Sequence, residues 1–410
     1  MGAGRLPEVT RSTRLKILTG LFISSVVACR QAPGLVEPPD TGGAGLDAGD
    51  AAQGGMDAGG MPVDADMSGA AGVGGSGGMP VDAGRDAANA AGGAPGPVLK
   101  EAAASSGKLI GVAVGASYLS EGPYAATVAG QFNYATPENE MKWESTEPAQ
   151  NSFTFASGDA IVAFGHQNGM QVKGHTLVWH SQLPAWVPAI TDANQLRAAM
   201  INHVFQVALH YAGQVVAWDV VNEVVADSGQ SLRSSVFYNL LGPGFIDDAF
   251  NAAHAADPNA RLYLNEYGAE GAGAKSDFVY NLVKGMLSRG VPIHGVGLQM
   301  HTMPADASPS AAQTATNMQR LAALGLDVAI TEMDVSICAG DLDTQSHRFH
   351  DIVAVCVAQP ACKAVTVWGV SDLHSWLNGM SCATPRPLLF DESYLAKPAQ
   401  LGVWNALSGH

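Results

Sequence analysis

The chain has 410 residues, of which 14% are charged, and its formal net charge is −16. A chain of this length holds one large domain or two of ordinary size. Because phosphate backbones repel negative charge, the acidic balance makes this chain a poor candidate for binding nucleic acid.

The first 29 residues have the pattern of an export signal. Three basic residues, Arg11, Arg14 and Lys16, precede the apolar stretch 17–28, which is too short to span a bilayer comfortably. The stretch ends in VVAC, which resembles the cleavage box of bacterial lipoproteins, where the cysteine becomes lipid-modified. We therefore expect residues 1–29 to direct export and a lipidated Cys29 to tether the chain to a membrane. Ordinary secretion with an unmodified Cys29 is the alternative.

Residues 30–97 differ in composition from everything that follows them. No aromatic residue occurs between Phe22 and Tyr118, while Gly, Ala and Asp are concentrated in residues 31–97. Such a segment cannot bury enough apolar surface to offset the entropy lost on ordering its backbone. We expect a disordered linker over 30–97 and a single folded domain over 98–410.

From residue 109 onward the chain repeats a cycle of a short apolar run, a polar loop and a longer segment with helical spacing. The expected strands are 109–115, 133–141, 171–179, 215–223, 261–267, 293–301, 327–335 and 364–372. The clearest helices are expected at 194–211, 245–256, 276–288, 310–323 and 346–356. Strands that alternate with helices in this way indicate parallel βαβ units.

Eight such units in about 310 residues match the size of a (β/α)₈ barrel. A doubly wound open sheet is the alternative, and the polar residues at the strand ends distinguish the two. They are Glu138, Asn139, His175, Trp179, Asn222, Glu223, Tyr267, Gln299, His301, Glu332, Asp334 and Trp368. Active sites of barrels are built at the carboxyl ends of their strands. An open sheet would not bring all eight ends around one hole, so these residues favour the barrel.

Glu223 stands at the end of the fourth expected strand, and Glu332 stands near the end of the seventh. A pair of opposed carboxylates is what cleavage of a glycosidic bond needs. One isolated glutamate in an apolar strand is more often a paired buried charge, but two at strand ends with polar neighbours favour catalysis. Strand alternation places Asp334 on the face of Glu332, so His301 on the adjacent strand could be held by Asp334 and directed at Glu332. Such a histidine would help to keep Glu332 ionised.

Four cysteines follow Cys29, all in the last quarter of the chain. In an exported protein an even number suggests disulfides. Of the three possible pairings we favour Cys356 with Cys362 as a local link and Cys338 with Cys382 as a tie between two loops. A zinc site is the alternative, but no CxxC spacing supports it. No HExxH motif occurs either, so we expect no metal and no other cofactor.

Seven motifs in this region occur together in one known family. They are TPENEMKWE (136–144), GHTLVWHSQLPAW (174–186), WDVVNE (218–223), GLQMH (297–301), ITEMDV (330–335), VTVWGVSD (365–372) and PLLFD (387–391). From about residue 109 to residue 407 the chain resembles the glycoside hydrolase family 10 xylanases. This resemblance implies a retaining endo-β-1,4-xylanase, with Glu223 as general acid and base and Glu332 as nucleophile. We expect the protein to act as a monomer.

The resemblance also implies roles for the other strand-end residues. Glu138, Asn139 and Lys142 match the set that binds the sugar on the non-reducing side of the cleaved bond. His175, Trp179, Asn222, Tyr267, Gln299 and His301 match residues around the reacting sugar and the nucleophile, and Trp368 and Trp376 match residues that wall in the sugar. Many relatives carry a disulfide where Cys356 and Cys362 stand. Glu266 and Gly268 depart from the family, in which aspartate and asparagine usually flank the tyrosine.

Two other functions fit the same groove. A surface protein that binds carbohydrate without cleaving it would keep the groove, but it would not need both carboxylates. A related hydrolase of β-1,4-glucan would differ in the shape of the pocket.

Overall fold

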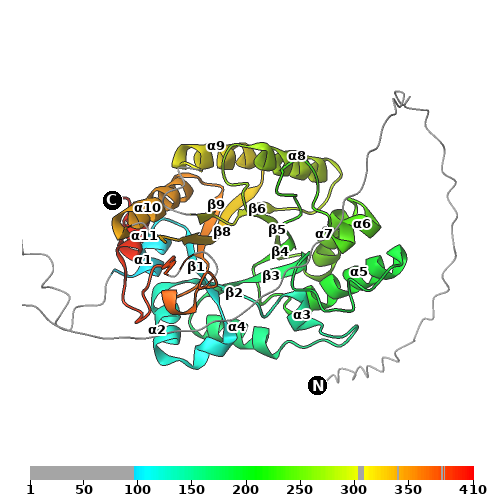
Figure 1. Cartoon of the computed structure of the whole chain (residues 1–410), viewed down its shortest axis with the longest axis horizontal. Helices are drawn as coiled ribbons and strands as arrows, with labels where there is room; N and C mark the ends of the chain where they lie inside the picture. The colour runs from blue at the N-terminus through cyan, green and yellow to red at the C-terminus, as the bar shows by residue number, and fades with distance from the viewer. Residues whose placement is uncertain (1–96, 303–308, 339–340, 380–381, 383) are drawn as a thin grey trace, which may run out of the picture. The chain divides into compact units, whose positions relative to one another are not determined.

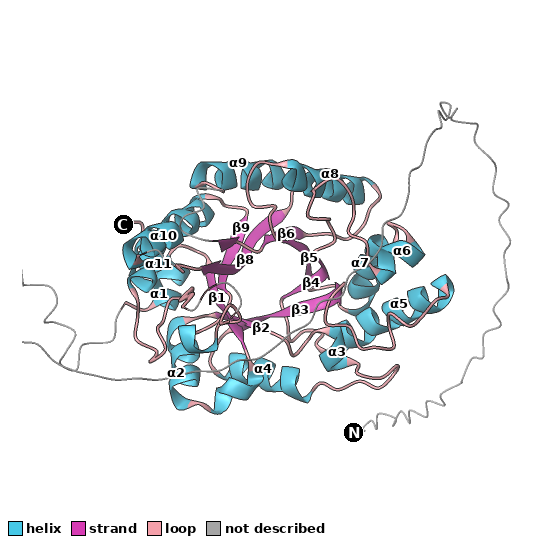
Figure 2. Ribbon diagram, viewed as in Figure 1, coloured by secondary structure: helices cyan, strands magenta, loops and turns pink. Residues whose placement is uncertain are grey.

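The computed structural model describes residues 97–410 except 303–308, 339–340, 380–381 and 383. The expected export signal, the lipidation site Cys29 and all but the last residue of the expected linker lie outside the described residues. In the described part, parallel strands form a closed ring that is surrounded by helices (Figure 1 and Figure 2).

The strands close into a barrel. They are β1 (Leu109–Val114), β2 (Tyr134–Pro137), β3 (Gln171–Trp179), β4 (Ala217–Asn222), β5 (Arg261–Glu266), β6 (Gly295–Leu298), β7 (His301–Thr302), β8 (Asp327–Val335) and β9 (Cys362–Val367). Strands β1 to β6 pair in chain order, β6 pairs with β8, and β8 pairs with β9. Since β9 also pairs with β1, the predicted (β/α)₈ barrel is confirmed and an open sheet is excluded.

The sixth predicted strand is not continuous. β6 and β7 both pair with β8, and together they occupy the place of the sixth predicted strand in the barrel. Between them Met300 has a φ of 68°, in the left-handed region, and its N–H donates to the Glu270 carboxylate (3.0 Å) rather than to a neighbouring strand. The prediction of one strand over 293–301 is therefore wrong, because a buried side chain takes the hydrogen bond of Met300.

Helices cover the outside of the barrel. They are α1 (Leu99–Ser105), α2 (Gly122–Gln131), α3 (Trp143–Thr146), α4 (Ala156–Gln167), α5 (Ala193–His210), α6 (Val236–Leu241), α7 (Phe245–Ala256), α8 (Ala274–Ser288), α9 (Ala311–Ala322), α10 (Leu342–Ala358) and α11 (Pro398–Ser408). The five predicted helices correspond to α5, α7, α8, α9 and α10, and their ends agree within a few residues. The others were not predicted, since most are short or rich in Ala and Gly and carry a weak apolar pattern.

Several helix ends are determined by single side chains. Asp192 caps α5 and Asp341 caps α10 by accepting from backbone N–H groups of the first turn. Ser310 and Gln313 form a reciprocal capping box at the start of α9. At the other end of α11, Gly409 adopts the left-handed conformation that commonly stops a helix.

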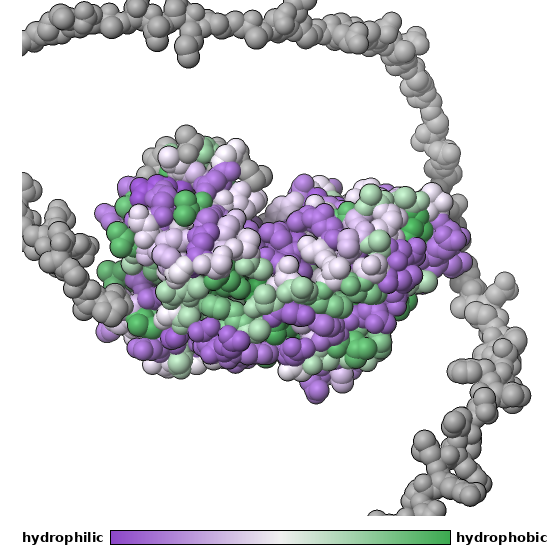
Figure 3. Space-filling view, turned by 90° about the horizontal axis from the view of Figure 1, so that it is seen from below, coloured by the Kyte–Doolittle hydropathy of each residue, from purple (hydrophilic) through white to green (hydrophobic). Residues whose placement is uncertain are grey.

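The main hydrophobic core lies between the barrel and the helices. Trp218 of β4 is fully buried there, with its ring 6.0 Å from that of Tyr211. A Cβ atom on Gly174 of β3 would lie 2.2 Å from the Trp218 ring, so only glycine fits at this position. The opposite faces of the helices meet solvent, and the side of the molecule drawn in Figure 3 is a mosaic of hydrophilic and hydrophobic residues. Within the described residues no helix is long and apolar enough to cross a membrane.

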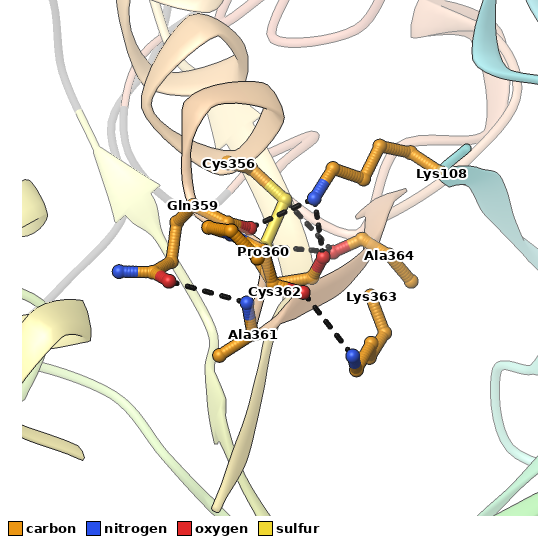
Figure 4. The surroundings of a disulfide bond; sticks show 8 residues. All are labelled: Lys108, Cys356, Gln359, Pro360, Ala361, Cys362, Lys363 and Ala364. Carbon is orange, nitrogen blue, oxygen red and sulfur yellow. Dashed lines mark hydrogen bonds between the residues drawn. A yellow bond between two sulfur atoms is a disulfide. The ribbon is translucent and has the colours of Figure 1, made fainter. Parts of the chain in front are cut away.

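Both expected disulfides are present. Cys338–Cys382 joins the loop after β8 to the loop after β9, with 5.6 Å between the Cα atoms. Cys356–Cys362 links α10 to the first residue of β9. Figure 4 shows that Lys108 reaches the loop closed by this second disulfide, where its Nζ donates to the carbonyls of Gln359 (2.8 Å) and Cys362 (2.7 Å). Because Lys108 directly precedes β1, it ties together the first and last strands where the barrel closes.

Replacing Lys108 should therefore loosen the closure of the barrel. We expect Lys108→Met to lower the free energy of unfolding by about 1–3 kcal/mol, because two carbonyls lose a charged donor. The measurement is chemical denaturation followed by circular dichroism. Lys284→Met, at an exposed position on α8, is the matched control and should unfold like the wild type. Equal stability of the two variants would contradict the role of Lys108.

Candidate active site

A cavity of about 680 Å³ opens at the carboxyl ends of the strands. Its lining includes every residue predicted to act on or contact a substrate: Glu138, Asn139, Lys142, His175, Trp179, Asn222, Glu223, Tyr267, Gln299, His301, Glu332, Trp368 and Trp376. Asp334 does not line the cavity but contacts His301 behind it. The barrel therefore gathers at one place residues that are more than 200 positions apart in the chain.

Glu332 is a buried carboxylate on β8. Burial alone would raise the pKa of Glu332, but a hydrogen bond from His301 and the charges of the nearby His175 and His301 imidazoles outweigh it. Asn265 Nδ2 also donates to Glu332 Oε1, at 2.6 Å. Together these contacts lower the pKa of Glu332 to about 2. Glu332 is therefore ionised at neutral pH despite its burial.

His301 is the cation that faces this carboxylate. Its Nε2 lies 3.3 Å from Glu332 Oε2 and its Nδ1 lies 2.9 Å from Asp334 Oδ2. Burial disfavours the charged ring, but the two carboxylates outweigh that effect and raise the pKa of His301 well above 6.5. Asp334 also accepts a hydrogen bond from Trp376 Nε1 (2.8 Å), which fixes both Asp334 and the indole. His301 is thus an imidazolium that donates to both acids.

Glu223 lies directly after β4 in a different environment. Its carboxylate accepts from Gln299 Nε2 (3.1 Å) and lies 3.3 Å from Asn222 Nδ2, so its hydrogen-bond partners are neutral amides. His180 Nδ1 is 4.0 Å away. Burial lowers the pKa of His180, which favours its neutral form. The Glu223 side chain is 14% exposed and that of Glu332 is 6% exposed. Glu223 is therefore the more accessible carboxylate.

Asn265 connects the two glutamates, and the sequence analysis missed it. This fully buried residue of β5 donates to both Glu332 Oε1 and Asn222 Oδ1 (2.9 Å), while its own oxygen accepts from Thr331 Oγ1 (2.6 Å). Asn222 in turn contacts Glu223. A buried amide at the end of an apolar strand was the available signal, since Asn222 shows the same pattern.

A polar group lies on one side of the two glutamates. Lys142 Nζ donates to Asn139 Oδ1 (2.9 Å) and to Gln182 Oε1 (2.7 Å), and it lies 4.9 Å from the centroid of the Trp179 ring. Gln182 lines the cavity but was not predicted, because it follows the strand end by three residues. Burial, partly opposed by Lys142, raises the pKa of Glu138 to about 7. These groups offer donors and acceptors to a polar ligand.

His175 is held from behind by a buried ion pair. Its Nδ1 lies 3.0 Å from Asp219 Oδ2, and the other oxygen of Asp219 lies 2.7 Å from Lys173 Nζ. Trp368 packs edge-on to His175 with 5.1 Å between the ring centroids. Asp219 was also missed, although a charged residue within the apolar run of β4 could have indicated a partner across the sheet. The result is an imidazole of fixed orientation in the cavity wall.

Tyr267 is supported by charged residues, among them Glu266, which departs from the family pattern. The Lys275 ammonium lies 3.4 Å from the centroid of the Tyr267 ring and 3.0 Å from the buried Glu266 carboxylate. The Tyr267 hydroxyl binds Asp227 and accepts from Arg233 (2.7 Å). Glu266 therefore supports the tyrosine through Lys275.

The cavity thus holds two carboxylates with unlike surroundings. Glu332 is ionised beside a cation, whereas Glu223 is more exposed and has amide partners. Enzymes that cleave glycosidic bonds use such a difference to give two acids two roles. The indoles of Trp179, Trp368 and Trp376 add apolar surfaces of the kind that pack against sugar rings. Among the described residues no group of three or more His, Cys, Asp or Glu could hold a metal ion. The site and fold define a glycoside hydrolase.

Comparisons with known proteins identify the family. The profile of glycosyl hydrolase family 10 matches residues 98–406. Endo-1,4-beta-xylanase C of Phanerodontia chrysosporium is 39% identical over 317 residues, which cover 74% of this chain and 78% of that protein. Xylanase 10B from Thermotoga maritima, known from a crystal structure, is 38% identical to this chain with a TM-score of 0.74. The match covers 76% of this chain and 98% of the Thermotoga maritima chain.

A structure of a related enzyme contains a sugar. Xylanase 10B from Thermotoga petrophila in complex with xylobiose is 37% identical, with a TM-score of 0.74 over 78% of this chain and 99% of that one. With matches of this extent, the chain belongs to glycosyl hydrolase family 10.

The role of His301 can be tested by titrating Glu332. We expect His301→Asn to raise the pKa of Glu332 from about 2 toward or above its ordinary 4.5, because burial is then opposed by fewer charges. Carbon-13 NMR of the labelled carboxyl groups measures this pKa, and Glu332→Gln assigns the signal. Trp376→Phe removes a donor from Asp334 but keeps the imidazolium, so its effect should be much smaller. An unchanged pKa in His301→Asn would contradict the role of His301.

Proposed function

We propose that this protein is an endo-1,4-β-xylanase that hydrolyses internal bonds of xylan with retention of anomeric configuration. The observation that carries the proposal is the pairing of a buried, ionised Glu332 with a more exposed Glu223 in one cavity. Family membership supports the substrate, since the curated relatives are named endo-1,4-beta-xylanases and a related structure contains xylobiose.

In the first step Glu332 attacks the anomeric carbon. The low pKa of Glu332 keeps the nucleophile ionised, and His301 holds one of its oxygens while Asn265 holds the other. Glu223 protonates the departing glycosidic oxygen as the bond breaks. The products of this step are a covalent glycosyl-enzyme on Glu332 and the shortened reducing-end chain.

In the second step water releases the sugar. Glu223, now deprotonated, removes a proton from the water that attacks the anomeric carbon, and Glu332 leaves as a carboxylate. Conversion of Glu332 to a neutral ester in the first step removes a nearby negative charge, which favours ionisation of Glu223 at this stage. The same carboxylate can therefore serve as acid and then as base.

The remaining cavity residues bind the sugars in this proposal. Glu138, Asn139 and Lys142 hold the sugar on the non-reducing side of the cleaved bond. Asn222, fixed by Asn265 at 2.9 Å, binds the 2-hydroxyl of the reacting sugar, a contact that strengthens as positive charge develops on the ring. The remaining predicted contacts surround the reacting sugar: His175, Trp179, Tyr267, Gln299, His301, Trp368 and Trp376.

Two measurements on wild type and one variant test this function. Proton NMR of a xylo-oligosaccharide digest should show the β-anomer of the new reducing end first, because two inversions give retention. Glu332→Gln should lower kcat/KM on xylan by at least about 10³-fold, since the amide is a poor nucleophile. Glu101→Gln, at an exposed position on α1, is the control and should match wild type.

Two outcomes would overturn parts of the proposal. If wild type and Glu332→Gln released reducing sugar at equal and negligible rates, the chain would bind carbohydrate without cleaving it. An initial α-anomer would show inversion. Rates on a soluble cellulose derivative that exceed those on xylan would indicate a glucanase instead.

We also propose that the protein is exported and that Cys29 carries the lipid that tethers it to a bacterial membrane. The basic and apolar residues before Cys29 support export. The two disulfides support it as well, because disulfides persist in oxidising compartments.

Cys29→Ala tests the tether in a bacterial host. Full-length wild type should incorporate labelled palmitate and fractionate with membranes, whereas Cys29→Ala should do neither. Ser25→Ala, inside the same apolar stretch, should remain labelled. Export of the wild type without label would contradict lipidation and leave ordinary secretion.

A further inference from the structure

The backbone of Glu223 breaks the alternation of its strand. In a regular strand consecutive side chains point to opposite faces, yet Asn222 and Glu223 both line the cavity. Glu223 achieves this with a φ of 56°, in the left-handed region that residues with a side chain rarely adopt. A return to extended backbone would continue β4 and turn the Glu223 carboxylate away from the cavity. Something must therefore hold residue 223 in this conformation.

Arg233 holds the segment through its carbonyls. Its Nε donates to the Glu223 carbonyl at 3.0 Å, and one terminal nitrogen donates to the Val225 carbonyl at 3.2 Å. The backbone N–H of Arg233 also donates to the Val224 carbonyl at 2.8 Å. One residue thus binds all three carbonyls of the segment 223–225. Its guanidinium supplies two of these contacts from a half-buried position, where water competes less effectively.

Glu266 holds the same segment through an amide. Its Oε2 accepts from the N–H of Val225 at 2.9 Å, and the N–H of Glu223 itself donates to the carbonyl of Asn265 at 2.9 Å. Glu266 is fully buried, which raises the pKa of its carboxyl group to about 7, and the Lys275 ammonium at 3.0 Å partly opposes that shift. The Glu266 carboxyl group therefore accepts a hydrogen bond from the Val225 N–H, while the Arg233 guanidinium donates to carbonyls of the same segment.

Asp227 and Tyr267 connect Arg233 to the side of the segment where Glu266 lies. Arg233 donates to Asp227 (2.7 Å) and to the Tyr267 hydroxyl (2.7 Å), and Tyr267 also binds Asp227. Lys275 contacts both the Tyr267 ring and Glu266. The loops after β4 and after β5 are therefore joined around the backbone of Glu223 by charged side chains.

We propose that Arg233 and Glu266 are positioning residues that hold residues 223–225 in the left-handed turn and so direct the Glu223 carboxylate at the departing oxygen. This proposal rests on the proposed role of Glu223 as acid and base. Neither residue lines the cavity. Both act through the backbone of Glu223, so their loss should impair the proton transfer more than the binding of sugars.

The dependence on leaving group distinguishes this role from a general structural one. A dinitrophenolate departs without a proton, whereas the sugar leaving group of xylan needs the acid. We expect Arg233→Met to lower kcat/KM on xylan by roughly 10- to 100-fold, with KM little changed. On dinitrophenyl β-xylobioside, kcat/KM reports only the first step and should fall less than about threefold. Arg233→Lys, which keeps the charge but only one donor nitrogen, should recover part of the loss on xylan.

Glu266 has its own conservative pair. Glu266→Gln keeps an oxygen that can accept from the Val225 N–H and should retain most of the activity on xylan. Glu266→Ala removes the acceptor and should show the same selective loss on xylan as Arg233→Met. Arg289→Met removes an arginine whose ion pair with Asp247 is exposed on the surface. It is the matched control and should behave like wild type on both substrates.

Thermal unfolding of each variant shows whether it is folded at the assay temperature. If Arg233→Met does not fold, Arg233→Lys or Glu266→Ala takes its place in the comparison. Equal losses on both substrates in a folded variant, or no loss on either, would overturn the positioning role of Arg233 and Glu266. Glu223→Gln separates the two hypotheses. If Glu223→Gln fails to show the selective loss on xylan, the proposed role of Glu223 as acid and base is wrong. If Glu223→Gln shows that loss and the variants of Arg233 and Glu266 do not, only the positioning role of these two residues is wrong.

Discussion

The hydrogen-bonded ion pair between the His301 imidazolium and the Glu332 carboxylate is the interaction on which the site depends. Burial would otherwise protonate Glu332, and a protonated acid cannot attack a sugar. The register of the barrel brings the two groups together, since the pairing of β7 with β8 places His301 opposite Asp334, which is two residues after Glu332 on the same strand. Asp334 then holds the far nitrogen of the ring, and Trp376 holds Asp334. The charge on Glu332 therefore follows from the packing of two neighbouring strands.

The two carboxylates illustrate how one barrel separates two acids. Glu332 lies within β8, where a shift in the β8–β9 register between Ile330 and Met333 accompanies its turn into the cavity. Glu223 lies one residue beyond β4, where alternation would direct it outward, and a left-handed backbone turns it back. The arrangement at Glu223 has support from two loops, whereas the one at Glu332 is formed within the sheet. That difference accounts for the charged side chains gathered around the turn at Glu223.

Much of this architecture could be predicted from the sequence, because alternating apolar runs and polar strand ends report directly on a barrel. The strand ends also indicated which side chains meet, as with Asp334, His301 and Glu332. Local backbone choices could not be predicted in this way. The break at Met300 depends on Glu270 from another loop, and the turn at Glu223 depends on Arg233 and Glu266. Asn265 was missed because a single buried amide in an apolar strand gives a weak pattern.

In the proposed mechanism the ionised, buried Glu332 forms the covalent bond and the more exposed Glu223 transfers protons. Incubation with a dinitrophenyl glycoside of 2-deoxy-2-fluoro-xylobiose, followed by peptide mass spectrometry, tests this assignment. The fluorine slows both steps by opposing positive charge on the ring, whereas the good leaving group speeds only the first, so the intermediate accumulates. We expect a fluoro-xylobiosyl group on the peptide that contains Glu332. A label on Glu223, or turnover without any labelled peptide, would contradict it.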